Sequence, residues 1–352
     1  MYFKSCNTIS KTLSKLQTAP KLYSPTKLAV LGKFYSTHEG SLSKVIDSWS
    51  KQVLNKEIVY NDNIDGRRVS FLRNVLAPHM PADYPALQLD PTTQEAAPGT
   101  PLFANSHLAY FWLPFKENEL SFDGYFAGEA PPPPFKQRVW AGGNLEFTSS
   151  NQLLVGQKSK LVSVITSVIE KSRTPSSGGP LAMIQMKRSV FNDFGLSLVE
   201  TRELAYMLET NPNRRNILPK MSPDISHTLK PTEITLFRYS ALTWNSHRIH
   251  YDQEYTRNSE NHPAVLVHGP LTCTLLLEFL RCHTPKGYQL AKFKYRAVSP
   301  LYVNQNLTLC IKWSNKTNPI LSDNTIECDL WALNGDGGVG MSGKATLCKT
   351  SE

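Results

Sequence analysis

Apolar and polar residues alternate through the middle of the chain, in runs that turn residues separate. The runs lie in residues 144–171, 178–192 and 196–208, and the turns contain TPSSGG and DFG. Alternation with a period of two is typical of strands that bury one face, and short turns between such strands favour antiparallel pairing. The pattern therefore predicts an antiparallel meander.

Two other segments have the longer period of a helix. We expect residues 45–75 to be helical, because SKVIDSWSKQVL places its apolar residues near one face. The second segment, HGPLTCTLLLEFLRCH, begins at His268 and is apolar on nearly every side from Leu271 to Leu280. This predicts a buried helix, with Pro270 at its first position, where the missing N–H has no cost.

Residues 76–143 are rich in proline and glycine and include PPPPF at residues 131–135. Four consecutive prolines can form neither a helix nor a central strand. We expect an extended surface segment there, and a ligand for a proline-recognition domain is the alternative.

The strand pattern occurs twice, with an offset of 148 residues. LEFTSSNQLLVGQKSKLVSVI begins at Leu145 and aligns with FKYRAVSPLYVNQNLTLCIKW, which begins at Phe293. The identical pairs are Val155 and Val303, Gln157 and Gln305, and Leu161 and Leu309. The repeated strand order predicts two copies of one α+β unit, a double hotdog in which each antiparallel sheet wraps a central helix. We expect the two sheets to pair side by side, with the first copy's helix near residues 42–55.

Positive charge is concentrated at the N-terminus. The 352-residue chain has a net charge of +9, and residues 1–38 contain six lysines and no acidic residue. Such a segment, rich in Ser and Thr, is typical of a mitochondrial presequence; a disordered basic tail is the alternative. Taking six from +9 leaves +3, so the rest of the chain does not indicate a nucleic-acid partner. No apolar run approaches the roughly 20 residues of a membrane span.

The cysteines do not indicate a metal or disulfide framework. They are Cys6, Cys273, Cys282, Cys310, Cys328 and Cys348. None forms a CxxC pair, and no Cys and His spacing fits a zinc site. We expect reduced thiols that act as small apolar side chains, and nothing favours a catalytic cysteine.

The candidate chemistry is densest in NSHRIHYD, which runs from Asn245 to Asp252. ALTWNSHRIHYDQEY, followed by HPAVLVHGPL, resembles the R-specific enoyl-thioester hydratases of the hotdog superfamily, also called MaoC-like proteins. It is most similar to fungal mitochondrial 3-hydroxyacyl-thioester dehydratases and two-hotdog mesaconyl-CoA hydratases. RVWAGGNLEF, residues 138–147, resembles their N-terminal half, and the whole resemblance covers roughly residues 135–350.

The resemblance implies a pocket motif of Asp, any residue, Asn, Pro, an aliphatic residue and His. Aligned on IH, the motif His is His250, and the Asp position holds Asn245. The Asn and Pro positions hold His247 and Arg248. Because a carboxamide cannot exchange protons as a carboxylate does, the acid–base work that Asp and His share does not transfer directly.

Dehydration of a 3-hydroxyacyl thioester removes a C2 proton and protonates the C3 hydroxyl, and an imidazole suits both steps. We expect His250 to transfer the proton, Asn245 to hold the hydroxyl or water, and His247 to be a reserve acid. Asp252 either orients a histidine or faces solvent. Arg248 either contacts the phosphates of the carrier or forms a surface ion pair.

The thioester carbonyl also needs a hydrogen-bond donor, and backbone N–H groups at a helix start supply one. Gly269 is expected to be this donor, since Pro270 has no N–H; a bare turn glycine is the alternative. His268 belongs to the same predicted oxyanion and substrate-binding set. A structural role is expected for the remaining histidines considered, His227, His262 and His283.

The sequence thus predicts a hydro-lyase that converts (R)-3-hydroxyacyl thioesters to trans-2-enoyl thioesters in mitochondrial fatty acid synthesis, without a metal or redox cofactor. The carrier is acyl carrier protein or CoA, the location is the matrix, and a homodimer is left open. The expected domains are a presequence (1–38), a non-catalytic hotdog (39–215) and a catalytic hotdog (216–352). The alternatives are a thioesterase, for which Glu278 lies too deep in the helix, and a non-catalytic acyl-binding subunit.

Overall fold

The computed structural model describes residues 42–112, 115–135, 137–172, 179–208, 216–314 and 325–350. The predicted presequence, residues 1–38, lies outside these ranges. Met1–Lys44 forms one unit and Val45–Glu352 a second, which contains every strand and labelled helix described below.

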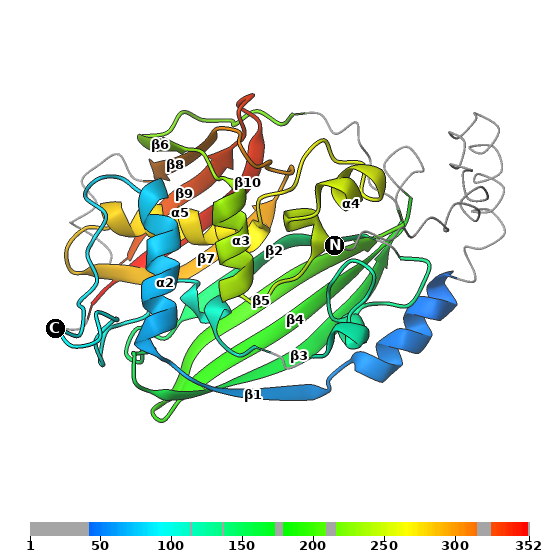
Figure 1. The fold of residues 1–352 in the computed structure, drawn as a ribbon, viewed down its shortest axis with the longest axis horizontal. Coiled ribbons are helices and arrows are strands. Elements are labelled where there is room, and N and C mark those ends of the chain that lie inside the picture. The colour runs from blue at the N-terminus through cyan, green and yellow to red at the C-terminus, as the bar shows by residue number, and fades with distance from the viewer. Residues whose placement is uncertain are drawn as a thin grey trace, which may run out of the picture. The chain divides into compact units, whose positions relative to one another are not determined.

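One ten-stranded sheet, with only antiparallel neighbours, runs through the second unit (Figure 1). Its order is β1-β3-β4-β5-β2-β7-β10-β9-β8-β6. The strands are β1 (Glu57–Asn63), β2 (Gln137–Phe147), β3 (Lys158–Lys171), β4 (Leu181–Asn192), β5 (Gly195–Met207), β6 (Ile225–Leu229), β7 (Tyr288–Ala297), β8 (Leu307–Trp313), β9 (Thr325–Leu333) and β10 (Val339–Lys349). The predicted meander is confirmed in β3, β4 and β5, which pair in sequence order.

The sheet contains the same five-strand arrangement twice, in mirror order about its centre. We call β1–β5 and their connections the first half, and residues 216–350 the second half. The halves meet where β2 pairs with β7, and Leu145 lies opposite Phe293. These two residues are equivalents in the 148-residue repeat, so a local two-fold axis passes between them. The predicted repeat and the side-by-side pairing of the sheets are both confirmed.

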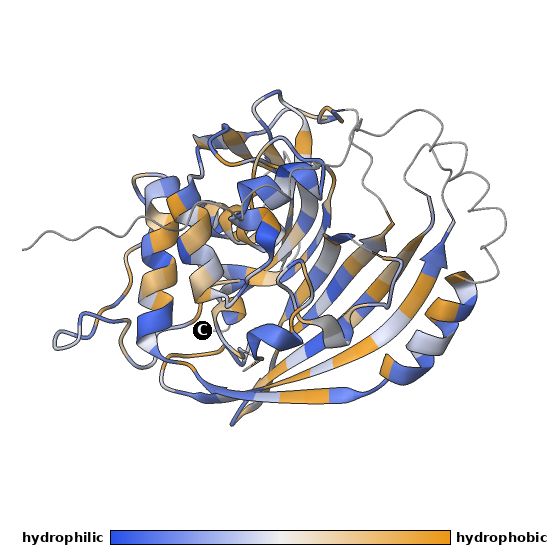
Figure 2. Ribbon diagram, turned by 45° about the vertical axis from the view of Figure 1, so that its right-hand side comes forward, coloured by the Kyte–Doolittle hydropathy of each residue, from blue (hydrophilic) through white to orange (hydrophobic). Residues whose placement is uncertain are grey.

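Apolar residues that match between the repeats lie in the core of each half. Leu145, Leu161, Phe293 and Leu309 are all fully buried. Figure 2 shows hydrophobic and hydrophilic positions alternating along the strands, as one buried face requires. Full burial of one such side chain contributes roughly 1.5–3 kcal/mol, so the periodic pattern that predicted the strands also stabilises them.

The labelled helices are α2 (Gly66–Leu76), α3 (Glu233–Leu242), α4 (Gln253–Asn258) and α5 (Gly269–His283). α2 and α3 each follow the first strand of their half and contact one another (Figure 1). α5 lies against β7, β8, β9 and β10 and is buried from Pro270 to Leu280. It is the central hotdog helix that the sequence predicted.

The first half differs from the prediction, because its described residues contain no counterpart of α5. A helix at residues 42–53 precedes β1 and ends where Leu54 bridges to Ile165 of β3, so it is not the central helix expected near residues 42–55. The expectation of a helical segment through residues 45–75 is also wrong, because β1 interrupts it. The alternating sequence EIVYNDN pairs with β3, and this tertiary pairing overrides the local helical pattern.

The described residues between α2 and β2 form loops and short 3-10 turns, in keeping with their many prolines and glycines. Residues 131–135 are neither helix nor strand, as predicted. A hotdog half without its central helix leaves one face of its strands open, and that face borders the pocket described next.

Within the described ranges, no helix is long and apolar enough to cross a membrane. The same ranges contain no group of His, Cys, Asp and Glu side chains that could hold a metal ion. The described cysteines are free thiols, namely Cys273, Cys282, Cys310, Cys328 and Cys348.

Candidate active site

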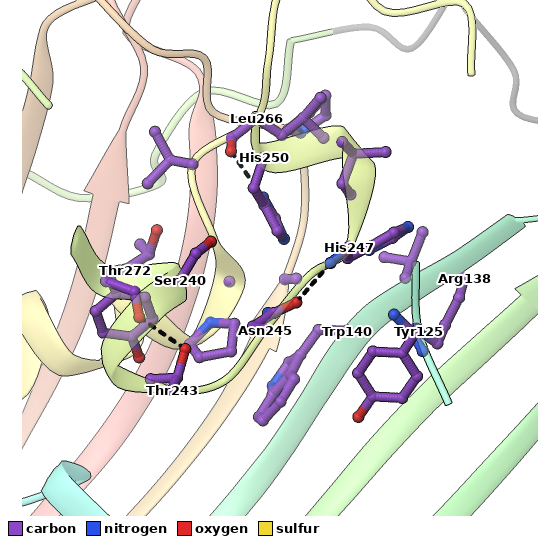
Figure 3. A pocket seen from close by; sticks show the side chains of 18 of the residues that line it. Tyr125, Arg138, Trp140, Ser240, Thr243, Asn245, His247, His250, Leu266 and Thr272 are labelled. Atoms are coloured by element: carbon purple, nitrogen blue, oxygen red, sulfur yellow. Dashed lines mark hydrogen bonds between the residues drawn. The ribbon is translucent and has the colours of Figure 1, made fainter. Parts of the chain in front are cut away.

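A cavity of about 1020 Å³ lies where the two halves meet (Figure 3). The first half contributes polar and aromatic side chains, among them Tyr125, Arg138 and Trp140. The second half contributes the predicted motif, with Asn245, His247, His250 and Gly269 all on the wall. The structure therefore brings four of the seven predicted site residues into one cavity, together with side chains from a half that was expected only to close it.

The motif loop is positioned by the end of α3. Thr232 caps α3 at its start, and the helix ends at Leu242. Trp244 then adopts a left-handed conformation (φ 51°), and the Asn245 N–H donates to the Ser240 carbonyl at 2.9 Å. This turn directs the chain back across the pocket wall and into the 3-10 turn Arg248–His250.

His250 is held in one orientation by a backbone hydrogen bond. Its Nδ1 lies 2.8 Å from the Leu266 carbonyl oxygen (Figure 3). A carbonyl only accepts, so Nδ1 carries the proton and Nε2 keeps its lone pair. The side chain is only 7% exposed, and burial lowers the pKa of His250 to about 4, against a smaller opposing effect of the Leu266 bond. At neutral pH His250 is therefore an uncharged imidazole with a defined tautomer.

His268 lies behind His250 and does not line the cavity, unlike the substrate contact that the sequence suggested. It is fully buried, and its ring stacks on His250 with 3.6 Å between ring centroids. Its Nε2 lies 2.8 Å from the Ser240 hydroxyl. Burial, and then the neighbouring His250, hold the pKa of His268 well below its ordinary value. His268 thus supports the His250 ring from behind as a second neutral imidazole.

Asn245 and His247 are connected through the backbone. The Asn245 side-chain oxygen accepts a hydrogen bond from the His247 N–H at 3.0 Å, which forms an Asx turn (Figure 3). The carboxamide oxygen is thereby occupied, and the Nδ2 group remains as a donor. The His247 ring is 4% exposed and lies edge-on to His250, with 5.6 Å between the centroids. Burial, and then the charge of Arg138, hold the pKa of His247 well below its ordinary value.

Gly269 is the first residue of α5 and Pro270 the second, one position later than predicted. A Cβ added at Gly269 would lie 3.4 Å from the Trp140 side chain, so the helix start packs closely on β2. Trp140 is itself fixed, because its indole N–H donates to the Tyr295 hydroxyl at 2.8 Å. The N-terminus of α5, with its positive end of the helix dipole, therefore opens on the pocket beside a rigid aromatic wall.

Arg248 and Asp252 form an ion pair at the surface, with 2.7 Å between the charged atoms. Asp252 also caps α4 by accepting a hydrogen bond from the Tyr255 N–H. Neither residue lines the cavity. Arg248 forms the surface ion pair that was one of its two predicted roles. Glu278 is fully buried and paired with Arg281, and it does not line the cavity.

A buried charged cluster that was not predicted from the sequence lies beneath the pocket. Glu200 is 1% exposed and accepts hydrogen bonds from both Arg188 and Arg202, and it lies 3.1 Å from His107. Burial alone would raise the pKa of Glu200, but Arg202 and Arg188 outweigh it and hold that pKa well below its usual range. The sequence did contain a sign of this cluster. Glu200 and Arg202 alternate in register with the apolar Leu204, which places all three on the buried face of β5.

The chain is similar to several known proteins. The family model for hydroxyacyl-thioester dehydratase type 2 matches residues 105–303. The chain is 30% identical over 285 residues to the mitochondrial hydroxyacyl-thioester dehydratase type 2 of Schizosaccharomyces pombe, an alignment that covers 73% of this chain and 91% of that protein. It is 32% identical over 222 residues to the mesaconyl-C(4)-CoA hydratase of Chloroflexus aurantiacus, covering 62% of this chain and 77% of the other.

The fold also matches solved structures. The crystal structure of a MaoC-like dehydratase from Phytophthora capsici superposes with a TM-score of 0.61 at 14% identity, covering 86% of this chain and 99% of that one. At this identity the likeness concerns the fold alone, and it confirms the predicted hotdog class.

Proposed function

This chain belongs to the hydroxyacyl-thioester dehydratase type 2 family, and we propose that it reversibly dehydrates (R)-3-hydroxyacyl thioesters to trans-2-enoyl thioesters. The proposal rests on the tautomer and the orientation of His250. Its Nδ1 is bound to the Leu266 carbonyl, and the opposite end of the ring points into the pocket (Figure 3). A neutral imidazole in a fixed orientation is the group that removal of a C2 proton requires.

In the dehydration direction, His250 Nε2 takes one proton from C2. The electrons of the C2–H bond form the C2=C3 double bond, the C3–O bond breaks, and its electron pair leaves with the hydroxyl oxygen. One proton must then reach that oxygen to release water, and His250 and His247 are the two imidazoles on the pocket wall. Asn245, whose side-chain oxygen is occupied by the turn, holds the hydroxyl through its Nδ2 group.

Negative charge develops on the thioester oxygen when C2 loses its proton. The Gly269 N–H, at the start of α5, is the proposed donor to this oxygen, with the helix dipole adding to its effect. Pro270 has no N–H, so the donor at this point must come from Gly269. The mechanism needs no group beyond the protein and the substrate.

We extend the proposal to the setting of the reaction. The Schizosaccharomyces pombe relative is named mitochondrial, and residues 1–38 have the composition of a presequence. Both support action in the mitochondrial matrix, on acyl carrier protein intermediates of fatty acid synthesis. In this proposal residues 216–352 form the catalytic domain, and residues 39–215 form a second domain that closes the pocket.

The test uses the purified full chain and crotonyl-CoA. We expect loss of the enoyl-thioester absorbance without release of free thiol. Replacement of His250 by Ala should lower turnover on the order of 100- to 10,000-fold, the usual contribution of general acid–base catalysis. His283→Ala, at the far end of α5, is the matched control and should keep near-normal turnover. Release of free thiol would instead identify a thioesterase. If crotonyl-CoA does not react at all, the remaining interpretation is a non-catalytic acyl-binding subunit.

A further inference from the structure

A loop of the first half is fastened to the catalytic motif. The Arg248 N–H donates to the Asp123 carbonyl at 2.8 Å, and the Ser246 hydroxyl donates to the Gly124 carbonyl. Gly124 adopts φ +83°, and a Cβ there would lie 2.1 Å from the Ser246 carbonyl oxygen. Backbone contact this close allows only glycine, so residues 121–126 hold a fixed position against the motif loop.

The Asp123 side chain is buried within this contact and is 10% exposed. One carboxylate oxygen, Oδ1, accepts hydrogen bonds from the Ser121 hydroxyl and from the Tyr125 N–H. The other oxygen, Oδ2, lies 3.5 Å from Nε2 of His247. The turn therefore fixes the carboxylate and leaves one of its oxygens directed at a pocket histidine.

Nε2 of His247 is buried and has no hydrogen-bond partner among the described residues. At 3.5 Å, the Asp123 oxygen is beyond a normal hydrogen bond, although a shift of a few tenths of an ångström would form one. Hydrogen bonds of catalytic groups are often long before substrate binds and shorten in the complex. With Nε2 facing Asp123, Nδ1 is the nitrogen of His247 that remains for the substrate.

We propose that Asp123 is a positioning residue that holds His247 by Nε2 and makes it the proton donor to the leaving C3 hydroxyl. The inference rests on the function proposed above and divides the work between two histidines. His250 takes the C2 proton on Nε2. That proton passes through the pocket, directly or by water, to Nδ1 of the neutral His247, and His247 then gives it to the departing oxygen, so that water leaves and both rings return to their starting state.

Electrostatics explain why His247 needs this carboxylate. Arg138 of β2 and the neighbouring His250 and His268 all disfavour a charged His247, and burial acts in the same direction. The Asp123 carboxylate, with Oδ2 3.5 Å from Nε2, would favour the charged ring once His247 gains a second proton. The motif itself holds Asn245 where a carboxylate would be expected, so the missing negative charge comes from the other half of the fold.

The first test is a double-mutant cycle in the full chain, assayed with crotonyl-CoA. Asp123→Asn keeps an oxygen for Ser121 and Tyr125 but removes the charge, and Asp123→Glu keeps the charge. We expect Asp123→Asn to lower kcat on the order of 100-fold with little change in KM, and Asp123→Glu to recover part of that loss. In a His247→Ala background, Asp123→Asn should have no further effect.

Ser121→Ala is the matched control, because it weakens the same turn without touching His247. Equal losses from Asp123→Asn with and without His247 would mean a structural role and overturn the inference. An unchanged kcat in Asp123→Asn would do the same. The double-mutant cycle requires a wild-type chain that hydrates crotonyl-CoA. An inactive wild type would therefore contradict the proposed dehydratase function, whereas the outcomes above concern only the role of Asp123.

The second test does not depend on activity. Nitrogen-15 NMR of labelled histidines distinguishes the two neutral tautomers, and spectra of His247→Ala and His250→Ala assign the signals. We expect the proton on Nε2 of His247 and on Nδ1 of His250. A His247 whose proton resides on Nδ1 would contradict the proposed contact with Asp123.

Discussion

Replacement of His250 by Gln should make folding less sensitive to acid. The pKa of an unfolded histidine is about 6.5, whereas burial lowers that of folded His250 to about 4. Between these values the unfolded chain binds more protons than the folded chain, so stability falls as the pH is lowered. Above the unfolded pKa the stabilisation is fully present. His250→Gln, which remains neutral throughout, removes this contribution.

The magnitude follows from the two pKa values. For one site with pKa 6.5 unfolded and about 4 folded, lowering the pH from about 7 to about 5 costs about 2 kcal/mol of stability. Urea unfolding of the full chain at both pH values measures this loss. We expect the loss to be about 2 kcal/mol smaller in His250→Gln than in the wild type. An equal loss in both proteins would refute the buried neutral state of His250.

Three further predictions concern the surroundings of the pocket. Glu200→Gln leaves two buried arginines without their carboxylate and should cost roughly 3–5 kcal/mol in urea unfolding; a loss below about 1 kcal/mol would contradict the paired cluster. Gly124→Ala forces a Cβ against the Ser246 carbonyl and should cost at least about 1–3 kcal/mol and lower kcat. Gly287→Ala, at a similar φ in open space, is its control and should cost less. Asn245→Ala removes one hydrogen bond to the substrate hydroxyl, worth roughly 0.5–1.5 kcal/mol, and should lower turnover of crotonyl-CoA by at most about 10-fold; a loss as large as that of His250→Ala would contradict a role limited to holding the hydroxyl.

The parts of the fold that local sequence determines were predictable. α5 could be placed from its apolar run and its proline, and the repeat from matching strand patterns. The missing central helix of the first half could not be inferred from periodicity. Likewise, EIVYNDN became β1 because β3 offers it an edge, and that depends on residues a hundred positions away.

The candidate site also combines features that local sequence determines with features that depend on long-range contacts. His250, His247 and Asn245 come from one short motif, so their convergence followed from local order along the chain. The fastening of Asp123 to that motif depends on a contact between the halves, and no spacing in the sequence indicates it. His268 was misplaced for a related reason, because only the packing of α5 decides whether it faces the cavity or the back of His250.

The most direct test of the central claim is to offer the purified full chain (R)- and (S)-3-hydroxybutyryl-CoA separately and follow formation of the enoyl thioester. The account predicts that the R form is dehydrated and the S form is not, and that His250→Ala slows the reaction of the R form at least about 100-fold. Dehydration of the S form, or undiminished turnover of the R form without His250, would contradict it.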